Sequence, residues 1–397
     1  MQYPITRRME SLQGSIIREL FKLIKKDPDI IPFAGGAPDN STFPIEDMAQ
    51  IVADVFRDDP ISLLQYGAAE GYMPLREAMR EHLTKTQGMQ LENDEIFTIS
   101  GAQQGADLTA KLFLNEGDTI LVESPSFVGC LNAYRSYGAN LHGIPMETDG
   151  MNIDKLEHAL KIQPNVRLIY TIPNFQNPSG VTTSLEKRKA IYALAQKYNV
   201  LILEDNPYGE LRFAGEHIPA IKSLDADGRV IYIASFSKTI APALRVGSIV
   251  FPKAIADRVN VAKQCTDVHT TVLMQHLCYT LLTKWDYAGH LARATALYKR
   301  KADLMLDAMA AHFHPSIQYT RPEGGMFVMA FLPDGMDSYP FVMKAINRKV
   351  ACVPGAAFGV DTSAPASGFR MSFTSPPEEK IAKGIEILGK LTHEWIK

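Results

Sequence analysis

Residues 231–247 of the chain read IYIASFSKTIAPALRVG. The segment opens with the apolar run Ile231 to Ile233, which is bounded by polar residues and predicts a short buried strand. Lys238 follows the end of this strand, where open α/β sheets bind their ligands. An amine there can lose part of its proton affinity and form a covalent bond, and Arg245 can bind a phosphate with two parallel hydrogen bonds. A covalent anchor and a phosphate clamp on one segment together suggest pyridoxal phosphate as the cofactor.

A second segment supplies the acidic group that this cofactor needs. Val200 to Leu203 predict another buried strand, and Asp205 lies at its carboxyl end, with Tyr208 in the loop that follows. A buried carboxylate needs a cationic partner, and a protonated pyridine nitrogen is such a partner. Because Asp205 and Lys238 end two successive predicted strands, we expect them to face each other across the cofactor. The alternative is that residues 205–208 form only a turn.

The segment SFSKTIAPALRVG resembles the cofactor-lysine segment of fold-type I aminotransferases, within them the branch that holds 2-aminoadipate and kynurenine/aminoadipate aminotransferases. PNFQNPSG at residues 173–180 is a further, fairly specific sign of this family. The resemblance covers essentially the whole chain. It implies an α/β fold with a mostly parallel seven-stranded sheet in a large domain and a smaller α+β domain. It also implies transfer of an α-amino group from an amino acid to a 2-oxo acid such as 2-oxoglutarate.

The phosphate site implied by the family combines a helix start with the lysine segment. Residues 95–107, EIFTISGAQQGAD, predict a strand, a glycine turn and a helix whose first N–H groups form an anion site, although many such turns read alike. The family often has Ser or Thr where this chain has Ala102, so one hydroxyl contact is absent. The expected phosphate contacts are Gly101, Ala102, Gln103, Ser235, Ser237 and Arg245.

The remaining cofactor contacts implied by the family surround the ring. Phe127 is expected to stack on the pyridine, for which a ring face suffices, and the alternative is a core Phe at a helix start. Asn177 and Tyr208 are expected to contact the phenolic oxygen. In the family, the tyrosine that matches Tyr66 reaches the phosphate of the neighbouring subunit. The resemblance therefore implies a homodimer with shared active sites.

Substrate contacts are expected from distant parts of the chain. Residues 368–373, GFRMSF, alternate so that Arg370 lies opposite the apolar face; such an arginine usually meets solvent, but the family places its α-carboxylate clamp here. Residues 15–26 predict an amphipathic helix, on which Arg18 is either a solvated charge or, as in the aminoadipate branch, the group that receives a distal carboxylate. The expected substrate contacts are Arg18, Gly36, Tyr66, Asn177 and Arg370.

Composition bounds the other possibilities. The chain has 397 residues, 46% hydrophobic and 21% charged, with a net charge of −3, which is ordinary for a globular enzyme of two domains and favours neither a nucleic-acid nor a membrane surface. The first residues lack the apolar core of a signal peptide. No histidine or cysteine set suggests a metal site. The cysteines lack CxxC spacing, so reduced thiols and a cytoplasmic location are expected; they are Cys130, Cys265, Cys278 and Cys352.

Two long helical patterns, at about 255–282 and 285–313, organise the second half of the chain. We expect an amino-terminal arm at 1–45, a large cofactor-binding domain at 46–285 and a small carboxyl-terminal domain at 286–397. Other reactions of the same cofactor, β-elimination or decarboxylation, are an alternative to amino transfer. A non-enzymatic effector-sensing domain, as in GntR-type regulators, is disfavoured because the chain shows no basic recognition element.

Overall fold

The protein is seen in a computed structural model that describes residues 3–10, 12, 16, 19–20, 22, 26–333 and 335–396. The helix expected at 15–26 lies mostly outside these residues, and Arg18 lies entirely outside them. Leu20 is described and packs in a small buried cluster with Ile30 and Phe358. The expected role of Arg18 stays a prediction.

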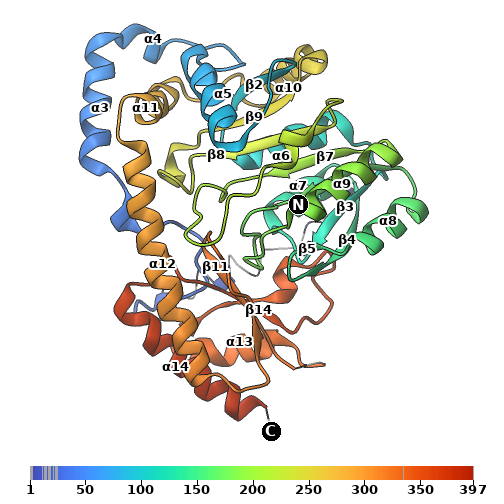
Figure 1. The fold of residues 1–397 in the computed structure, drawn as a ribbon, viewed down its shortest axis with the longest axis vertical. Helices are drawn as coiled ribbons and strands as arrows, with labels where there is room; N and C mark the ends of the chain where they lie inside the picture. The colour runs from blue at the N-terminus through green and yellow to red at the C-terminus, as the bar shows by residue number, and fades with distance from the viewer. Residues whose placement is uncertain are drawn as a thin grey trace.

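A mixed sheet forms the centre of the larger part of the molecule (Figure 1). Its strands are β2 (Asp94–Ile99), β3 (Thr119–Ser124), β4 (Asn140–Glu147), β5 (Gly150–Met151), β6 (Val166–Thr171), β7 (Leu201–Asp205), β8 (Val230–Ser235) and β9 (Gly247–Pro252). Within the described residues the order is β2-β9-β8-β7-β6-β3-β4-β5, with β8, β7, β6, β3 and β4 parallel and β9 antiparallel to both neighbours. The seven strands that we expected are joined by an eighth, the two-residue β5, which pairs antiparallel with β4.

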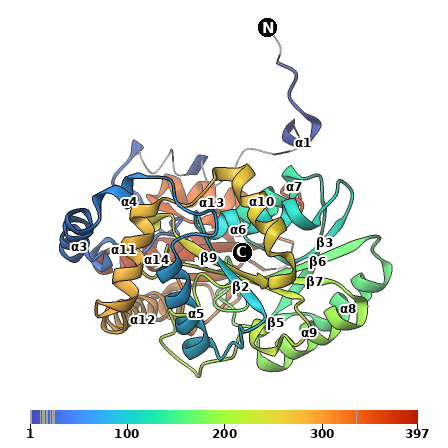
Figure 2. The same cartoon turned by 90° about the horizontal axis from the view of Figure 1, so that it is seen from above.

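Helices cover both faces of this sheet. They are α3 (Ile45–Asp58), α4 (Pro60–Leu64), α5 (Met73–Gln87), α6 (Ala102–Phe113), α7 (Val128–Ser136), α8 (Ile153–Ile162), α9 (Leu185–Tyr198), α10 (Ala256–Asp267) and α11 (Val272–Thr283). In β3, Ile120 and Val122 pack in the core that includes α6 and α7, whereas Leu121 packs in the core that includes α8 and α9. Figure 2 shows these two pairs of helices on opposite sides of the strands. Because alternate side chains enter opposite cores, the middle of each central strand is apolar on both faces, as in Ile120–Val122 of β3 and Leu201–Leu203 of β7.

The two strands that we expected to carry the site lie side by side. Asp205, the last residue of β7, is opposite Ile233 of β8 in a parallel pair. Lys238 follows the end of β8 after Phe236 and Ser237. Since the carboxyl ends of parallel strands meet at one edge of the sheet, both side chains reach the same region.

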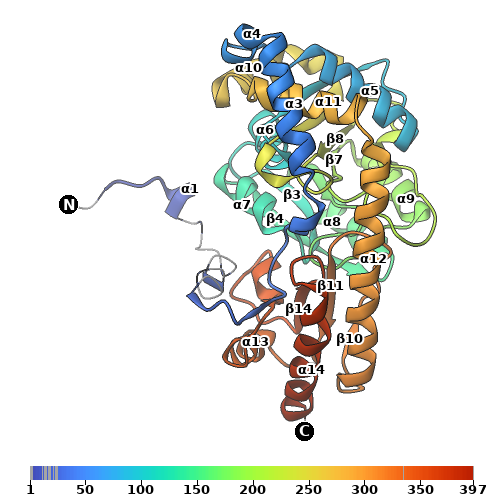
Figure 3. The same ribbon diagram turned by 90° about the vertical axis from the view of Figure 1, so that its left-hand side faces the viewer.

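A smaller antiparallel sheet forms the second part of the molecule, with the order β10-β11-β14-β13. Its elements are β10 (Gln318–Tyr319), β11 (Phe327–Phe331), β13 (Val353–Pro354), β14 (Gly368–Ser372), α13 (Ser338–Asn347) and α14 (Glu378–Trp395). The long helix α12 (Tyr287–His312) runs from the larger part to the smaller one and packs against α14 (Figures 1 and 3). β1 (Ile31–Pro32) pairs with β12 (Val350–Ala351), and α1 (Arg7–Glu10) precedes them.

The helical pattern predicted at 255–282 is wrong as a single helix. α10 ends at Asp267 and α11 begins at Val272. Between them Val268 has φ +65°, a conformation that no helix continues through and that a β-branched residue rarely adopts. The pattern at 285–313 is confirmed as α12, while the domain boundary near 285 stays a prediction. Among the described residues, no helix combines the length and apolar character needed to cross a lipid bilayer.

Candidate active site

A cavity of about 560 Å³ lies beside the carboxyl ends of β7 and β8, and residues of the smaller sheet complete its wall. It brings together most of the residues that the sequence predicted for the site. Those in its lining are Gly36, Ala102, Gln103, Phe127, Asn177, Asp205, Tyr208, Ser235, Ser237, Lys238, Arg245 and Arg370. Segments up to 334 positions apart in the chain, from Gly36 to Arg370, therefore share one pocket.

Lys238 is held beside the loop that carries Gly36. Its Nζ donates a hydrogen bond to Gly36 O at 2.7 Å. Burial lowers the pKa of Lys238 to about 8, and the positive charges of Arg370 and Arg245 act in the same direction. A larger share of the amine is therefore neutral near physiological pH than for an exposed lysine. A neutral amine is the form that attacks a carbonyl group.

Asp205 presents an unsatisfied oxygen. The side chain is buried, and its Oδ2 accepts hydrogen bonds from Tyr170 Oη at 2.9 Å and Cys130 Sγ at 3.9 Å. Its Oδ1 is buried and has no hydrogen-bond partner among the described residues. Burial raises the pKa of Asp205 to about 6, and this effect outweighs the hydrogen bonds from Tyr170 and Cys130, which lower it. A buried carboxylate oxygen without a donor is costly, so this oxygen fits a donor that a ligand brings.

Arg370 is a buried cation that forms no ion pair with any residue in the described part of the chain. Its Nη1 donates to Asn177 Oδ1 at 2.8 Å, and Asn177 Nδ2 donates to Tyr208 Oη at 3.4 Å. The guanidinium carbon lies 4.3 Å and 4.9 Å from the ring centres of Phe327 and Phe358. Burial lowers the pKa of Arg370 to about 10, and its Nε lacks a partner among the described residues. An unpaired buried charge fits an anionic ligand.

Arg245 and the start of α6 form the other end of the cavity. Arg245 Nη1 donates to Ser237 Oγ at 3.3 Å, and its Nη2 donates to Ser100 O at 2.9 Å. Gly101 is the N-cap of α6 with φ +83°, and a Cβ on it would lie 2.2 Å from Arg245 Nη2. The glycine thus leaves room for the guanidinium beside a helix start with unbonded N–H groups. This combination is suited to a phosphate group.

One predicted residue, Tyr66, lies away from this cavity, and Arg18 is outside the described residues. Tyr66 is 81% exposed and lines a separate cavity of about 910 Å³ together with α4, α5 and α10 residues. Its ring packs edge-on against His269, with centroids 5.8 Å apart. Within one chain, Tyr66 therefore does not belong to the cavity of Lys238, and its expected role requires a second subunit.

The residues that support Asp205 and Arg370 were not predicted from the sequence. Tyr170 lies in β6 and Cys130 in α7, and both donate hydrogen bonds to Asp205 Oδ2. The tyrosine hydroxyl that follows the apolar pair Leu168-Ile169 in the strand VRLIYT was the available signal for Tyr170. Nothing in the sequence marks Phe327 or Phe358, because they reach Arg370 through the packing of the smaller sheet.

Comparison with known proteins agrees with this geometry. The family model of aminotransferase class I and II matches residues 28–388. The chain is 39% identical to aromatic-amino-acid aminotransferase 1 of Thermococcus litoralis, covering 97% of this chain and 93% of that protein. It is 37% identical to 2-aminoadipate transaminase of Thermus thermophilus, covering 96% and 94%. The solved kynurenine aminotransferase of Pyrococcus horikoshii superposes with a TM-score of 0.95 at 37% identity, covering 99% and 98%. The chain belongs to the class I and II aminotransferases.

Proposed function

We propose that this aminotransferase binds pyridoxal 5′-phosphate in the cavity that holds Lys238 and moves the α-amino group of an amino acid to a 2-oxo acid. The observation that carries the proposal is that Asp205 Oδ1 has no hydrogen-bond partner in the described part of the chain and lies in a cavity wall shared with Lys238. Burial lowers the pKa of Lys238 to about 8. When bound, the cofactor supplies an aldehyde for the lysine and a ring that stabilises negative charge at the substrate Cα. Two relatives are solved with ligands of this chemistry: PMP in one, a phosphopyridoxyl-leucine adduct in the other.

Each residue of the cavity then has a definite task. Lys238 Nζ would anchor the cofactor covalently, and its neutral amine would move a proton to and from the substrate Cα. Asp205 Oδ1 would accept a hydrogen bond from the protonated ring nitrogen, and Tyr208 and Asn177 would contact the phenolic oxygen. Phe127 packs on the ring face. The phosphate would be held by Ser235, Ser237, Arg245 and the helix start formed by Gly101, Ala102 and Gln103, where the Gly101 N–H itself donates to Ile99 O at 2.8 Å.

Arg370 orients the substrate. Among the described residues its Nε has no hydrogen-bond partner and its charge has no carboxylate partner, which suits the α-carboxylate that a planar guanidinium binds with two parallel bonds. Holding the carboxylate there favours loss of the Cα proton over loss of carbon dioxide. We propose 2-aminoadipate, glutamate, or an aromatic or aliphatic amino acid as donor and 2-oxoglutarate as acceptor. Gly36 lies beside the substrate, and Arg18 receives a distal carboxylate when the donor has one.

We propose further that the enzyme is a homodimer in which Tyr66 completes the partner's phosphate site. Large apolar side chains are exposed on α3, α4 and α10, as expected for a surface that a second subunit covers. They are Ile45, Ile61, Leu64 and Val261, with exposures of 69%, 75%, 75% and 55%. All four cysteines, each among the described residues, are free, which supports a reducing, cytoplasmic location.

A donor panel tests the function. The purified protein with its cofactor is mixed with single amino acids, and the spectral change and products are recorded. Amino transfer predicts glutamate when 2-oxoglutarate is added and no release of ammonia. Ammonia with loss of a side-chain group would indicate β-elimination, and binding without products would indicate an effector sensor. Either outcome would overturn the proposal.

A further inference from the structure

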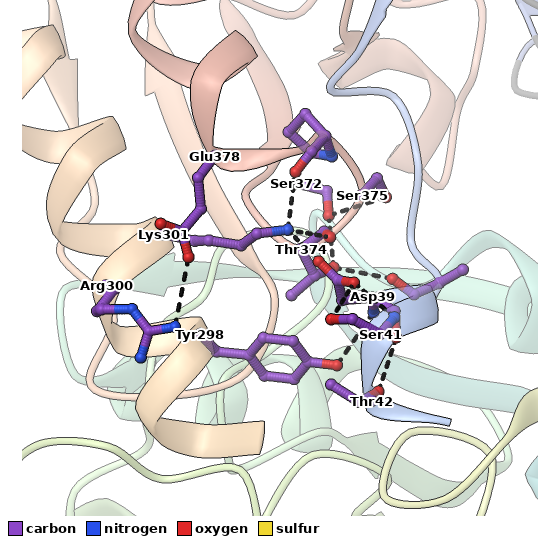
Figure 4. Close-up of polar contacts among 12 residues, drawn as sticks. Asp39, Ser41, Thr42, Tyr298, Arg300, Lys301, Ser372, Thr374, Ser375 and Glu378 are labelled. Carbon is purple, nitrogen blue, oxygen red and sulfur yellow. Dashed lines mark hydrogen bonds and ion pairs between the residues drawn. The ribbon is translucent and has the colours of Figure 1, made fainter. Parts of the chain in front are cut away.

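A buried lysine of α12 joins separate parts of the chain near the site (Figure 4). The side chain of Lys301 is 2% exposed, and its ammonium contacts a carboxylate oxygen of Asp39. The same Nζ donates to Thr374 O at 3.1 Å and to Pro376 O at 2.7 Å. Three N–H donors therefore meet three oxygen acceptors. Removing this ammonium would leave three acceptors without their donor, which is costly in a buried place.

The first part that Lys301 joins is residues 32–39, named the strap below. Asp39 ends the strap, and its Oδ1 accepts hydrogen bonds from Ser41 N and Ser41 Oγ at 2.8 Å and 2.7 Å. The N–H of Asp39 donates to Tyr298 Oη at 3.2 Å. Burial disfavours the ionised form of Asp39, but the bonds from Lys301 and Ser41 outweigh it and hold its pKa below the ordinary value. Two residues of α12 thus fix the end of the strap.

The second part is residues 372–376, which begin at the last residue of β14. This segment runs along the strap: the N–H of Ser372 donates to Phe33 O at 2.8 Å, and Thr374 Oγ1 donates to Ala37 O at 2.8 Å. Figure 4 shows Lys301 reaching toward Thr374 and Asp39, with Ser372 beside Thr374. Lys301 therefore holds the strap and this segment against each other from the side of α12.

The strap carries the carbonyl groups that contact the two buried cations of the site. Arg370 Nη2 donates to Ala34 O and Gly35 O, both at 3.0 Å, and Lys238 Nζ donates to Gly36 O at 2.7 Å. We propose that Lys301 is a positioning residue of the transfer reaction, which through Asp39 sets the strap against Arg370 and so orients the guanidinium for the substrate carboxylate. This inference rests on the proposed function of Arg370.

The neighbouring cations of α12 provide the control. Lys299 Nζ pairs with Asp303 Oδ2 at 2.6 Å, and these side chains are 51% and 52% exposed. Arg300 pairs with Glu378 at 3.4 Å, and both side chains are also well exposed. Surface pairs of this kind contribute little to stability. Lys299→Met therefore makes the same side-chain replacement as Lys301→Met on the same helix, at a lysine that pairs with Asp303 and not with the strap.

The experiment compares Lys301→Met, Asp39→Asn and Lys299→Met with the unchanged protein. Amide hydrogen exchange is followed by mass spectrometry in peptides covering 31–39 and 368–376, with and without cofactor, and kcat and KM are measured for the amino donor. We expect Lys301→Met to exchange about tenfold faster in the strap and to raise KM about tenfold, because the strap loses its charge-assisted bond from the ammonium to Asp39. We expect kcat to change by less than about threefold, since no group that touches the reacting atoms is altered.

Lys299→Met should match the unchanged protein in both readouts. Asp39→Asn keeps the bonds of Lys301 to Thr374 O and Pro376 O, so it should raise the strap exchange rate and KM by a smaller factor. It provides the test if Lys301→Met does not fold. Unchanged strap exchange, or a fall in kcat at constant KM, would overturn the inference. If the protein without substitutions transfers no amino group, the proposed function is overturned instead. The hydrogen-exchange measurement would still decide whether Lys301 holds the strap.

Discussion

Lys238 and Arg370 are bound to adjacent carbonyl oxygens of one loop: Lys238 Nζ donates to Gly36 O at 2.7 Å, and Arg370 Nη2 donates to Gly35 O at 3.0 Å. Burial lowers the pKa of each, and the charge of Arg370 lowers the pKa of Lys238 further. Neither cation pairs with a carboxylate among the described residues. The substrate side of the cavity therefore carries positive charge that an anion neutralises.

The first prediction concerns the planar guanidinium group of Arg370. Arg370→Lys keeps the cation but removes the planar fork, so KM for the amino donor should rise about a hundredfold. Steady-state kinetics with one donor measures it. Arg348→Lys is the control, since Arg348 binds Glu394 with two bonds of 2.9 Å and 2.6 Å at the surface. An Arg370→Lys enzyme with unchanged KM would remove the guanidinium from substrate binding.

The second prediction follows from the raised pKa of Asp205, about 6 against an ordinary value of 3.8. Between these values the folded protein holds a proton that the unfolded chain has released, so stability falls as pH rises through this window. The loss of folding stability caused by ionising the buried Asp205 is complete above about pH 6 and absent below about pH 4. Asp205→Asn should therefore stabilise the cofactor-free protein at pH 7 by roughly 2–3 kcal/mol and leave it unchanged near pH 4.

Urea unfolding of the cofactor-free proteins at the two pH values measures this difference. The same variant should bind the cofactor more weakly, because an amide does not favour the protonated ring nitrogen. A stability difference equal at both pH values would contradict ionisation of Asp205 as its cause.

The third prediction uses two glycines in left-handed conformations. Gly101 has φ +83° and Gly88 has φ +66°, so an alanine at either is strained by roughly 1–2 kcal/mol. A Cβ on Gly88 meets nothing within 4 Å, whereas a Cβ on Gly101 lies 2.2 Å from Arg245 Nη2. Both variants should therefore lose stability, but only Gly101→Ala should also weaken cofactor binding. Thermal unfolding and cofactor titration separate the two effects, and equal affinities would show that the phosphate does not use Arg245.

The sequence predicted those parts of the site that depend on local pattern. β7 and β8 are short apolar runs with polar ends, so their parallel pairing and the positions of Asp205 and Lys238 could be predicted. The resemblance to aminotransferases added Arg370 and Asn177, whose roles no periodicity indicates. The cavity now brings these four residues together.

Other features depend on contacts that no local pattern carries. Cys130 meets Asp205 across 75 positions, and Lys301 meets Asp39 across 262. The apolar helical periodicity also continues through Val268, although the helix ends there and α11 starts anew. No glycine or proline lies between α10 and α11 to indicate this end. Such contacts arise from packing between elements that are distant in sequence, and only the folded chain shows them.

The central claim is that Lys238 anchors pyridoxal phosphate opposite Asp205. The most direct test is to load the protein with the cofactor, reduce the covalent linkage with borohydride, and map the labelled peptide by mass spectrometry. The account predicts one label per chain, on Lys238, and a Lys238→Ala protein that takes no label, lacks the visible absorbance band and has no transfer activity. A label on another lysine, or a Lys238→Ala protein that keeps both absorbance and activity, would contradict it.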